Sequence, residues 1–352
     1  MTDSALELLQ TLGHEEVVIV RDPPSGLQAV IAIHDTSLGP AVGGTRMRLY
    51  PSFDQALIDA LRLSRAMSYK AALANMARGG GKAVIVGDPA RDKSSALLSA
   101  YARALDRLGG RFHTGCDMGF SLADAERLGR LSPHVSHTRA GSGMDTADFA
   151  ALGVFESIRA VAGLLDQELA SLRVAIQGLG QLGWRLAQKL HEAGSALIVS
   201  DTDPALPARA ARELGAASVP PEAIFDVEAD LFSPNAAGSV LNRGSIARLR
   251  CRAVVGGANE QLADAAAGDL LHQRGILYAP DYVVNAGGLL SLLFEVGECD
   301  QAATIERVRA IGPRLAGLIE QSGAEGVPTH RLVDRLAEQR LAAARARRGT
   351  NR

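Results

Sequence analysis

Cysteine is scarce in this chain of 352 residues, and the three that occur, Cys116, Cys251 and Cys299, are widely spaced. So few cysteines exclude a disulfide framework and a cysteine metal cluster, and they favour a reducing compartment. A strong net charge is also absent, because 37 Lys and Arg residues against 39 Asp and Glu residues give a formal charge of −2. This balance excludes a general attraction to nucleic acid or to an anionic membrane.

Long apolar runs are missing as well. The longest one, Ala286 to Phe294, is far shorter than the roughly 20 residues that a membrane-spanning helix needs. The first residues, Met1 to Glu7, lack the basic and apolar regions of a signal peptide. With 47% hydrophobic residues and a length that suits two domains, we expect a soluble, cytoplasmic globular protein.

Two lysines stand twelve positions apart, at the end of a predicted helix and at the start of a predicted strand. Lys70 lies in the helical pattern of residues 53–76, and Lys82 follows Gly79–Gly81 and opens the apolar run Ala83–Val86. An ammonium at the mouth of a buried strand is costly to desolvate unless an anion binds it. The pattern therefore favours an anion-binding site; the alternative is a tight turn with two solvated lysines.

The second half of the chain alternates short strands with helices, from a strand at 173–177 to one at 276–278. Repeated βα units of this kind build a parallel sheet. The first half contains predicted strands at 16–21 and 27–34 before the lysine helix. A polar segment at 138–146 separates the halves, and we expect a hinge there. These patterns predict an α/β fold in two domains.

Gly178, Gly180 and Gly183 form a G-x-G-x-x-G pattern between a predicted strand and a predicted helix. In that context the glycines permit a tight turn, close approach of a pyrophosphate and packing of helix on strand. Asp201 ends the next strand, where its carboxylate can bind ribose hydroxyls and would repel a 2′-phosphate. NAD is therefore the expected cofactor; the alternative is a Rossmann-like sheet without a ligand. The residues assigned to the cofactor from this region are Gly178, Leu179, Gly180, Gln181, Leu182, Gly183 and Asp201.

Together with Asp117, these motifs resemble those of the NAD-dependent amino-acid dehydrogenases. The chain is similar to the leucine, phenylalanine, valine and tryptophan branch of the glutamate dehydrogenase superfamily, and its longer matching segments are Leu38–Arg46 and Tyr278–Gly288. The resemblance implies a homo-oligomer whose subunit has a cleft between two domains. The implied domains are an N-terminal α/β substrate domain at 1–140, to which the helix at 325–352 returns, and a C-terminal Rossmann domain at 146–324.

By resemblance, the reaction is the reversible oxidative deamination of an L-amino acid to a 2-oxo acid and ammonia, with no metal. Lys70 then holds the substrate carboxylate, Lys82 is the base that activates water, and Asp117 relays a proton to or from the amine. Burial and a neighbouring cation, which we expect to be Lys70, would lower the pKa of a lysine base. Gly79–Gly81 would leave room for the substrate. The alternatives are an exposed surface lysine at 70 and a loop-capping aspartate at 117.

Further residues complete the implied site. Asn285 would bridge substrate and nicotinamide, Asn259 would lie near the nicotinamide ribose, and Ala236 belongs to a segment that crosses the crevice at the strand ends; the alternative is that such asparagines only satisfy their own turns. Val42 stands near the position where glutamate enzymes carry a lysine, which implies an apolar substrate. Gly115 replaces the alanine typical of leucine enzymes and favours a larger side chain, although one methylene discriminates by only about 1–3 kcal/mol. The substrate set comprises Lys70, Gly43, Gly44, Val42, Gly115, Asn285, Leu289 and Leu292.

The segment before Gly153 departs from the family. Ala150 stands where a threonine normally meets the nicotinamide carboxamide, and Asp148 replaces a proline. Such changes would alter the substrate preference, slow turnover or shift the contact to Thr146. Two hypotheses remain: an active dehydrogenase for a large apolar amino acid, of the phenylalanine/tryptophan or the leucine/valine type, and a degenerate homologue that binds NAD or an amino acid as a sensor or assembly subunit.

Overall fold

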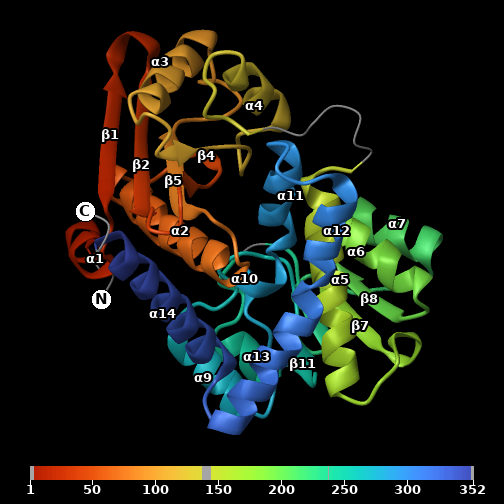
Figure 1. Ribbon diagram of the computed structural model, residues 1–352. Coiled ribbons are helices and arrows are strands. Elements are labelled where there is room, and N and C mark those ends of the chain that lie inside the picture. Colours follow the sequence, from red (N-terminus) through yellow and green to blue (C-terminus); the bar gives the residue numbers. More distant parts are fainter. Residues whose placement is uncertain (1–3, 137–143, 237, 350–352) are drawn as a thin grey trace. The chain divides into compact units, whose positions relative to one another are not determined.

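The computed structural model describes residues 4–136, 144–236 and 238–349, and the chain divides into two compact units (Figure 1). Unit 1 comprises residues 1–140 and 336–352, and unit 2 comprises residues 141–335. Both units mix helices and strands, which confirms the predicted α/β class. Most of the hinge expected at 138–146 lies outside the described residues. None of the described helices combines the length and the apolar character that a membrane span requires.

Unit 1 is built on a mixed sheet in which β5 is central and β1 is an edge strand. The strand order is β1-β2-β5-β3-β6, and β4 also pairs with β5. β2 is antiparallel to both β1 and β5, whereas β3 and β4 run parallel to β5. The strands are β1 (Glu16–Asp22), β2 (Leu27–Asp35), β3 (Ala41–Val42), β4 (Thr45–Arg48), β5 (Gly79–Val86) and β6 (Phe112–His113).

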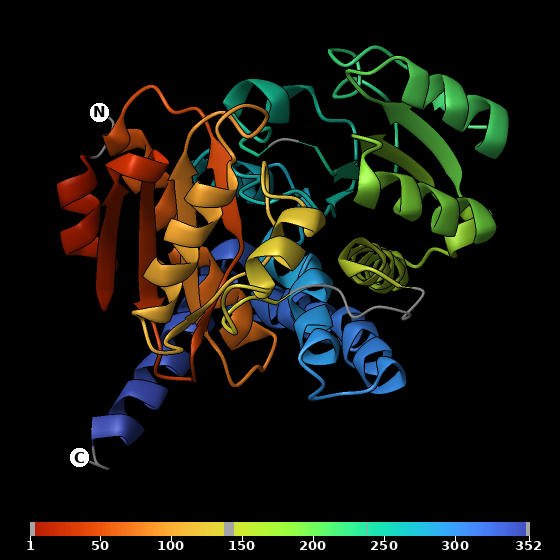
Figure 2. The ribbon, with the colours of Figure 1, turned by 90° about the horizontal axis from the view of Figure 1, so that it is seen from above.

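Helices cover both faces of this sheet, and β2 and β5 are accordingly buried at nearly every position (Figure 2). Val30, Ala32 and Val84 pack with α1 and α2, whereas Ile31 and Ile85 pack with α3 and α4. The helices of this unit are α1 (Ala5–Leu12), the short η1 (Pro23–Ser25), α2 (Phe53–Leu73), α3 (Ser95–Asp106), α4 (Leu122–Gly129) and the end of α14 (Thr329–Gly349). Lys82 is paired with Ala32 and therefore points toward the α2 face.

The three glycines before Lys82 are strand residues that neighbours crowd, so the prediction that they leave room for a substrate is wrong. A Cβ at Gly79 would lie 2.0 Å from the Asp35 carbonyl oxygen, and one at Gly80 would lie 2.0 Å from the Ser68 nitrogen. A Cβ at Gly81 would lie 2.6 Å from the Phe112 ring. The glycines therefore let α2 and the neighbouring strands approach β5 closely.

Unit 2 contains the parallel sheet that the strand–helix alternation predicted, in the order β12-β11-β10-β7-β8-β9. The chain moves outward from β7 to β9 and then returns to the other side of β7 at β10. Ligands of such sheets bind beyond the carboxyl ends of the strands at this switch point. The strands are β7 (Arg173–Gln177), β8 (Ala196–Ser200), β9 (Ala217–Ser218), β10 (Leu231–Pro234), β11 (Ala253–Val254) and β12 (Leu277–Tyr278).

The helices of unit 2 follow the strands in the usual alternation, and α6 and α7 lie beside β7 and β8 in Figure 1. They are α5 (Thr146–Leu164), the short η2 (Leu169–Ser171), α6 (Gln181–Glu192), α7 (Ala205–Leu214), α8 (Arg243–Arg248), α9 (Ala265–Gln273), α10 (Asp281–Val284), α11 (Gly287–Glu295), α12 (Gln301–Arg309), α13 (Ile311–Glu325) and the start of α14.

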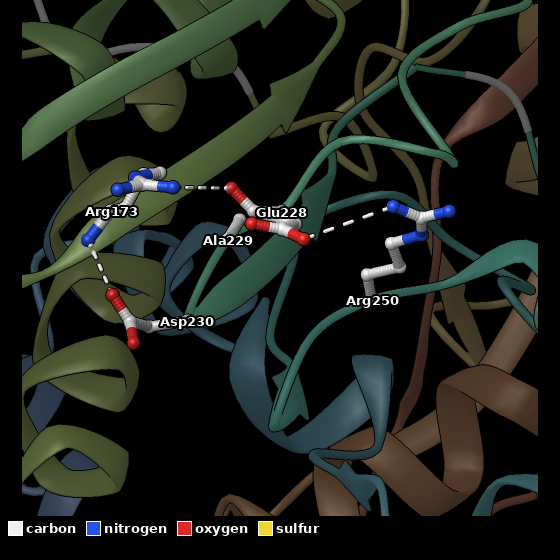
Figure 3. Close-up of a pocket in the computed structure, with 5 residues that line it drawn as sticks. All are labelled: Arg173, Glu228, Ala229, Asp230 and Arg250. Carbon is white, nitrogen blue, oxygen red and sulfur yellow. Dashed lines mark hydrogen bonds and ion pairs between the residues drawn. The ribbon is translucent and has the colours of Figure 1, made fainter.

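A pocket of about 580 Å³ lies at the amino ends of β7 and β10, opposite the end where ligands bind (Figure 3). The Arg173 nitrogen donates to the Asp230 carboxylate at 2.8 Å, and the Arg173 guanidinium donates to the Glu228 carbonyl oxygen at 3.2 Å. Arg250 lies 3.8 Å from the Glu228 carboxylate. These charged groups satisfy one another, so we assign the pocket a structural role in joining the two strands.

Two histidines of unit 1 lie side by side, with their ring centroids 4.9 Å apart; His34 is buried and His14 is partly buried. His14 Nε2 contacts the Leu61 carbonyl oxygen at 3.1 Å and Ser64 Oγ at 2.7 Å, and His34 Nδ1 contacts Ser68 Oγ at 2.8 Å. Burial and the neighbouring His34 lower the pKa of His14 to about 4, and burial also lowers the pKa of His34. Both rings are therefore neutral at pH 7.

We expect the protein to lose stability as the pH falls from about 6.5 toward about 4. The unfolded chain protonates His14 near its ordinary pKa of 6.5, whereas the folded protein resists until about 4, so protons favour the unfolded state in this window. The free energy of unfolding should fall by ~1–2 kcal/mol by pH 5, allowing for the partial exposure of the ring. Urea unfolding at pH 7.5 and 5 measures this loss. The variant His14→Gln should lose less, and an equal loss would assign the effect to other groups.

Candidate active site

Lys82 and Asp117, which the sequence separates widely, form a buried ion pair in unit 1. Lys82 projects from β5 and Asp117 follows β6, and their side chains are 8% and 20% exposed. Lys82 Nζ lies 2.5 Å from Asp117 Oδ2. Burial alone would raise the pKa of Asp117, but Lys82 and Arg46 outweigh it and lower this pKa to about 2. Asp117 is therefore ionised at neutral pH and is more than a loop cap.

Two glycines allow this pair to form. A Cβ at Gly43 would lie 1.8 Å from the Gly81 carbonyl oxygen, and one at Gly44 would lie 2.5 Å from the Cys116 carbonyl oxygen. The segment 43–44 thus lies tightly between β5 and the loop that carries Asp117. Any side chain at either position would push the lysine and the carboxylate apart.

Lys70 lies in the last turn of α2, in the same unit, and is partly buried. Helix α2 meets β5 where Ser68 lies against Gly80, since a Cβ at Gly80 would be 2.0 Å from the Ser68 nitrogen. This contact fixes the helix that carries Lys70 against the strand that carries Lys82.

The apolar residues assigned to the substrate are divided between the units. Val42 in β3 is 3% exposed, and a Cβ at Gly115 would lie 3.1 Å from the Ser136 carbonyl oxygen. The space that Gly115 leaves is thus bordered by this carbonyl group. Leu289 is buried and Leu292 is partly buried on α11 in unit 2.

The glycine-rich loop of unit 2 connects β7 to α6. Gly178 has a φ of +91°, and a Cβ on it would lie 2.7 Å from the Ala236 Cβ, which places Ala236 at the switch point. A Cβ at Gly183 would lie 2.0 Å from the Gly178 carbonyl oxygen. By contrast, no described atom lies within 4 Å of a Cβ at Gly180, the N-cap of α6. The loop therefore offers open backbone at a helix N-terminus, which suits a pyrophosphate.

Asp201 lies at the end of β8 and holds the glycine-rich loop. Its Oδ2 accepts a hydrogen bond from the Leu179 nitrogen at 2.7 Å, and its Oδ1 accepts one from the Asp203 nitrogen at 3.0 Å. Gln181 and Leu182 follow as the first residues of α6. The carboxylate is thus fixed beside the loop that the sequence assigned to the cofactor.

Three buried polar atoms without partners in the described part of the chain lie at or beyond the carboxyl ends of strands in unit 2. Among the described residues, Gln177 Oε1 at the end of β7, Ser200 Oγ at the end of β8 and Asn285 Oδ1 have no hydrogen-bond partner. Asn285 Nδ2 donates to the Gly257 carbonyl oxygen at 3.1 Å and to Asn259 Oδ1 at 2.8 Å. Buried polar atoms are nearly always satisfied, so this edge fits a ligand that forms hydrogen bonds.

The altered segment before Gly153 forms a capped N-terminus of helix α5. The Asp145 and Asp148 side chains each accept from the other's backbone nitrogen as a capping box. Both carboxylates also pair with Arg185 of α6, at 2.8 Å and 2.7 Å. Asp148 therefore joins the start of α5 to the helix that follows the glycine-rich loop.

Thr146 and Ala150 lie beside Gly288 at the start of α11. A Cβ at Gly288 would lie 3.5 Å from both the Thr146 Cγ2 and the Ala150 Cβ. The Thr146 hydroxyl donates to Glu295 Oε1 at 3.0 Å. The sequence suggested that the Thr146 hydroxyl contacts the nicotinamide carboxamide. In the structure this hydroxyl is bonded to Glu295.

Arg46 is the charged residue of this site that the sequence reasoning missed. Its Nε donates to Asp117 Oδ2 at 3.2 Å, and its guanidinium pairs with Asp59 Oδ2 at 3.1 Å. The available signal was that Arg46 is the charged residue in the segment Leu38–Arg46, which is otherwise composed of small and apolar residues.

Two family models match the chain. The model described as "Glu/Leu/Phe/Val dehydrogenase, dimerisation domain" matches residues 14–126. The model described as "Glutamate/Leucine/Phenylalanine/Valine dehydrogenase" matches residues 206–310.

Curated proteins are similar to the chain over nearly their full length. Leucine dehydrogenase of Geobacillus stearothermophilus is 39% identical, with 95% of this chain and 92% of the relative covered. Phenylalanine dehydrogenase of Bacillus thermotolerans is 40% identical, with 94% and 89% covered. The solved structure of L-tryptophan dehydrogenase from Nostoc punctiforme superposes with a TM-score of 0.83 at 39% identity, covering 97% of this chain and 99% of that one.

Proposed function

The chain belongs to the glutamate/leucine/phenylalanine/valine dehydrogenase family, and we propose that it catalyses the reversible NAD-dependent oxidative deamination of a large apolar L-amino acid. The products are a 2-oxo acid and ammonia. The observation that carries this proposal is the buried Lys82–Asp117 pair. The reaction needs a base for water and a carboxylate for the amine, and this pair supplies one of each.

Lys82 suits the part of the base. Only four of the 37 cationic residues in the chain are lysines, and the others are arginines, which cannot lose their proton under physiological conditions. A lysine is thus used at 82 where an amine that can lose its proton is required. We assign Lys82 to take a proton from the water that attacks the imine carbon, and to return it in the reverse direction.

Asp117 and Lys70 hold the two ends of the amino-acid group. The ionised Asp117 carboxylate attracts the substrate ammonium and relays protons to and from the amine. Lys70, at the end of α2, holds the α-carboxylate. When bound, NAD⁺ accepts the hydride from the substrate Cα. We propose that unit 1 binds the amino acid and that unit 2 binds the cofactor.

Unit 2 fits NAD in three respects. Gly180 leaves open space at the N-terminus of α6 for a pyrophosphate, and Asp201 stands at the end of β8 for the ribose hydroxyls. Asn285, with its unpartnered Oδ1, and the adjacent Asn259 would bind the nicotinamide end. The negative charge of Asp201 favours NAD over NADP.

The residues that we assign to the substrate side chain carry no charge or polar group. They are Val42 and Gly115 in unit 1 and Leu289 and Leu292 in unit 2. The relatives at about 40% identity are named for leucine, phenylalanine and tryptophan, so the substrate belongs to this group of large apolar amino acids. Gly115 favours its larger members.

The ordered N-terminus of α5 removes the main support for a degenerate homologue. Asp148, which replaces the usual proline, caps α5 and pairs with Arg185. The replacement is thus accommodated by the local structure, and Lys70, Lys82 and Asp117 are all present. An active enzyme is the conclusion that these observations favour.

The assay that tests this function follows NADH oxidation with ammonia and the 2-oxo acids of leucine, valine, phenylalanine and tryptophan, with 2-oxoglutarate as an acidic comparison. We expect turnover on the apolar acids and little on 2-oxoglutarate. In Lys82→Ala, kcat should fall by about 10²–10⁴, because the general base is lost, while NADH affinity stays nearly unchanged.

Lys93→Ala is the matched control, since Lys93 pairs with Asp124 at 2.6 Å and is not assigned to the site. Its turnover should stay near that of the wild type. If the wild-type protein binds NADH but turns over none of the 2-oxo acids, the hypothesis that it is an enzyme is refuted. Substantial activity in Lys82→Ala would remove only the assignment of the base.

A second measurement concerns cofactor choice. Asp201→Asn keeps an acceptor for the Leu179 nitrogen but removes the charge that repels a 2′-phosphate. We expect NADH to bind about tenfold more weakly, and the preference for NADH over NADPH to narrow. Isothermal titration with both cofactors measures this, and Asp203→Asn is the neighbouring control. Unchanged affinities for both cofactors would refute the ribose role of Asp201.

We also propose that unit 1 joins copies of this chain. The family model over residues 14–126 is described as a dimerisation domain, β1 is an edge strand, and Ile19 on it is 60% exposed. An edge strand with an exposed apolar side chain suits pairing with a second copy. Light scattering should give the wild type a multiple of 36.9 kDa, and Ile19→Lys should give a smaller particle. Leu131→Lys, which changes an exposed leucine away from β1, should leave the particle size unchanged. A monomeric wild type would contradict the proposal.

A further inference from the structure

Five polar side chains of unit 1 form a continuous row that ends at the Lys82–Asp117 pair. Tyr50 donates to Asp59 Oδ2 at 2.5 Å, and Asp59 pairs with Arg46 at 3.1 Å. Arg46 Nε then donates to Asp117 Oδ2 at 3.2 Å, the same oxygen that Lys82 contacts at 2.5 Å. The row therefore alternates in charge, from the tyrosine through Asp59, Arg46 and Asp117 to Lys82.

The row joins β4, β5, α2, the loop before α2 and the loop after β6. Arg46 belongs to β4, which pairs with β5, and its partner in register is Val84, so its side chain shares a sheet face with Lys82. Asp59 lies on α2, the helix that carries Lys70, and Asp117 lies in the loop after β6. Arg46 thus links three parts of unit 1: β5, which carries Lys82; α2, which carries Lys70; and the loop that carries Asp117.

We propose that Arg46 positions the Asp117 carboxylate for catalysis, and that Asp59 and Tyr50 position Arg46. This inference rests on the proposed function, because it assigns Lys82 the loss of a proton. If Lys82 were the sole counter-ion of Asp117, its deprotonation would leave a buried carboxylate unpaired, which is strongly unfavourable. Arg46 cannot lose its proton and so remains a permanent counter-ion while Lys82 changes charge.

The charges around Arg46 support this role. Arg46 is only 8% exposed, and although burial lowers its pKa, Asp117 and Asp59 raise it above the ordinary value, so the guanidinium stays charged. Burial and the bond to Asp59 raise the pKa of Tyr50, which therefore remains a neutral donor. The groups that face Asp117 are Lys82 from β5 and Arg46 from β4. Those that face the far side of Arg46 are Asp59 from α2 and Tyr50 from the loop before it.

The test compares the pH dependence of kcat/KM for deamination. Arg46→Gln removes a cation near the base, so the rising limb of the profile should move to higher pH by about one unit. Asp59→Asn keeps an acceptor for Arg46 but removes its negative charge, so the limb should move to lower pH. Shifts of opposite sign identify an electrostatic role, because a loss of packing would lower the rate in both variants without moving the limbs apart.

Two further variants complete the comparison. Arg46→Lys keeps the positive charge, and it should hold the midpoint within about 0.3 pH units of the wild type while lowering kcat several-fold. It also serves where Arg46→Gln does not fold. Arg91→Gln changes an arginine of unit 1 whose side chain is 72% exposed and pairs with Asp88, and it should leave the profile unchanged.

A readout without turnover separates this inference from the proposed function. Carbon NMR of protein labelled at aspartate carboxyl groups, with Asp117→Asn to identify the signal, follows the titration of Asp117, whose pKa is about 2. Arg46→Gln should raise this pKa by about one unit or more. If the wild type is active and neither the limb nor the titration moves, Arg46 has no positioning role and the proposed function stands. If the wild type turns over none of the acids, the proposed function fails, and the Asp117 titration alone decides for or against Arg46.

Discussion

The ion pair between Lys82 and Asp117 is the interaction on which the arrangement of unit 1 depends. Largely buried charges such as these are tolerated when they are paired and hydrogen-bonded. Their approach requires glycines at 43 and 44, because a Cβ at either would collide with backbone of β5 or of the Asp117 loop. The burial of the Asp117 carboxylate also explains why a second cation, Arg46, contacts the same oxygen as Lys82. Arg46 keeps its charge and is therefore a permanent counter-ion for Asp117.

Unit 2 differs from unit 1 in that some buried polar atoms at the carboxyl ends of its strands have no hydrogen-bond partner within the described part of the protein. Unit 1 satisfies its buried charges with one another, whereas the carboxyl ends of β7 and β8 leave the Gln177 and Ser200 oxygens without partners among the described residues. Asn285, held by Gly257 and Asn259, adds a third such atom. A parallel sheet can carry unsatisfied groups at this edge because a ligand supplies the missing hydrogen bonds. The difference suits one unit that holds charged reactants and another that binds a large polar cofactor.

Much of the fold could be predicted from local patterns, because the period of apolar residues and the strand–glycine–helix sequence at 173–193 depend only on near neighbours. The role of Gly79–Gly81 could not, since the groups that crowd them, Ser68 and Phe112, are distant in the sequence and lie against them only after folding. Arg46 was missed for the same reason, because its two carboxylates come from other elements. The replacement at Asp148 suggested lost function, yet its partner Arg185 is visible only in three dimensions.

The sequence suggested a neighbouring cation, Lys70, as the group that would prepare Lys82 to lose its proton, whereas the structure places a carboxylate 2.5 Å from it. The two are compatible, because a bound amino acid would compete with Lys82 for Asp117. In the function that we propose, the ammonium of the amino acid competes with Lys82 for Asp117, and its carboxylate binds Lys70. Once the ammonium binds Asp117, the lysine has lost its counter-ion and its proton is easier to remove. On this argument Lys82 becomes a base only when the amino acid binds, because Asp117 pairs with it until then.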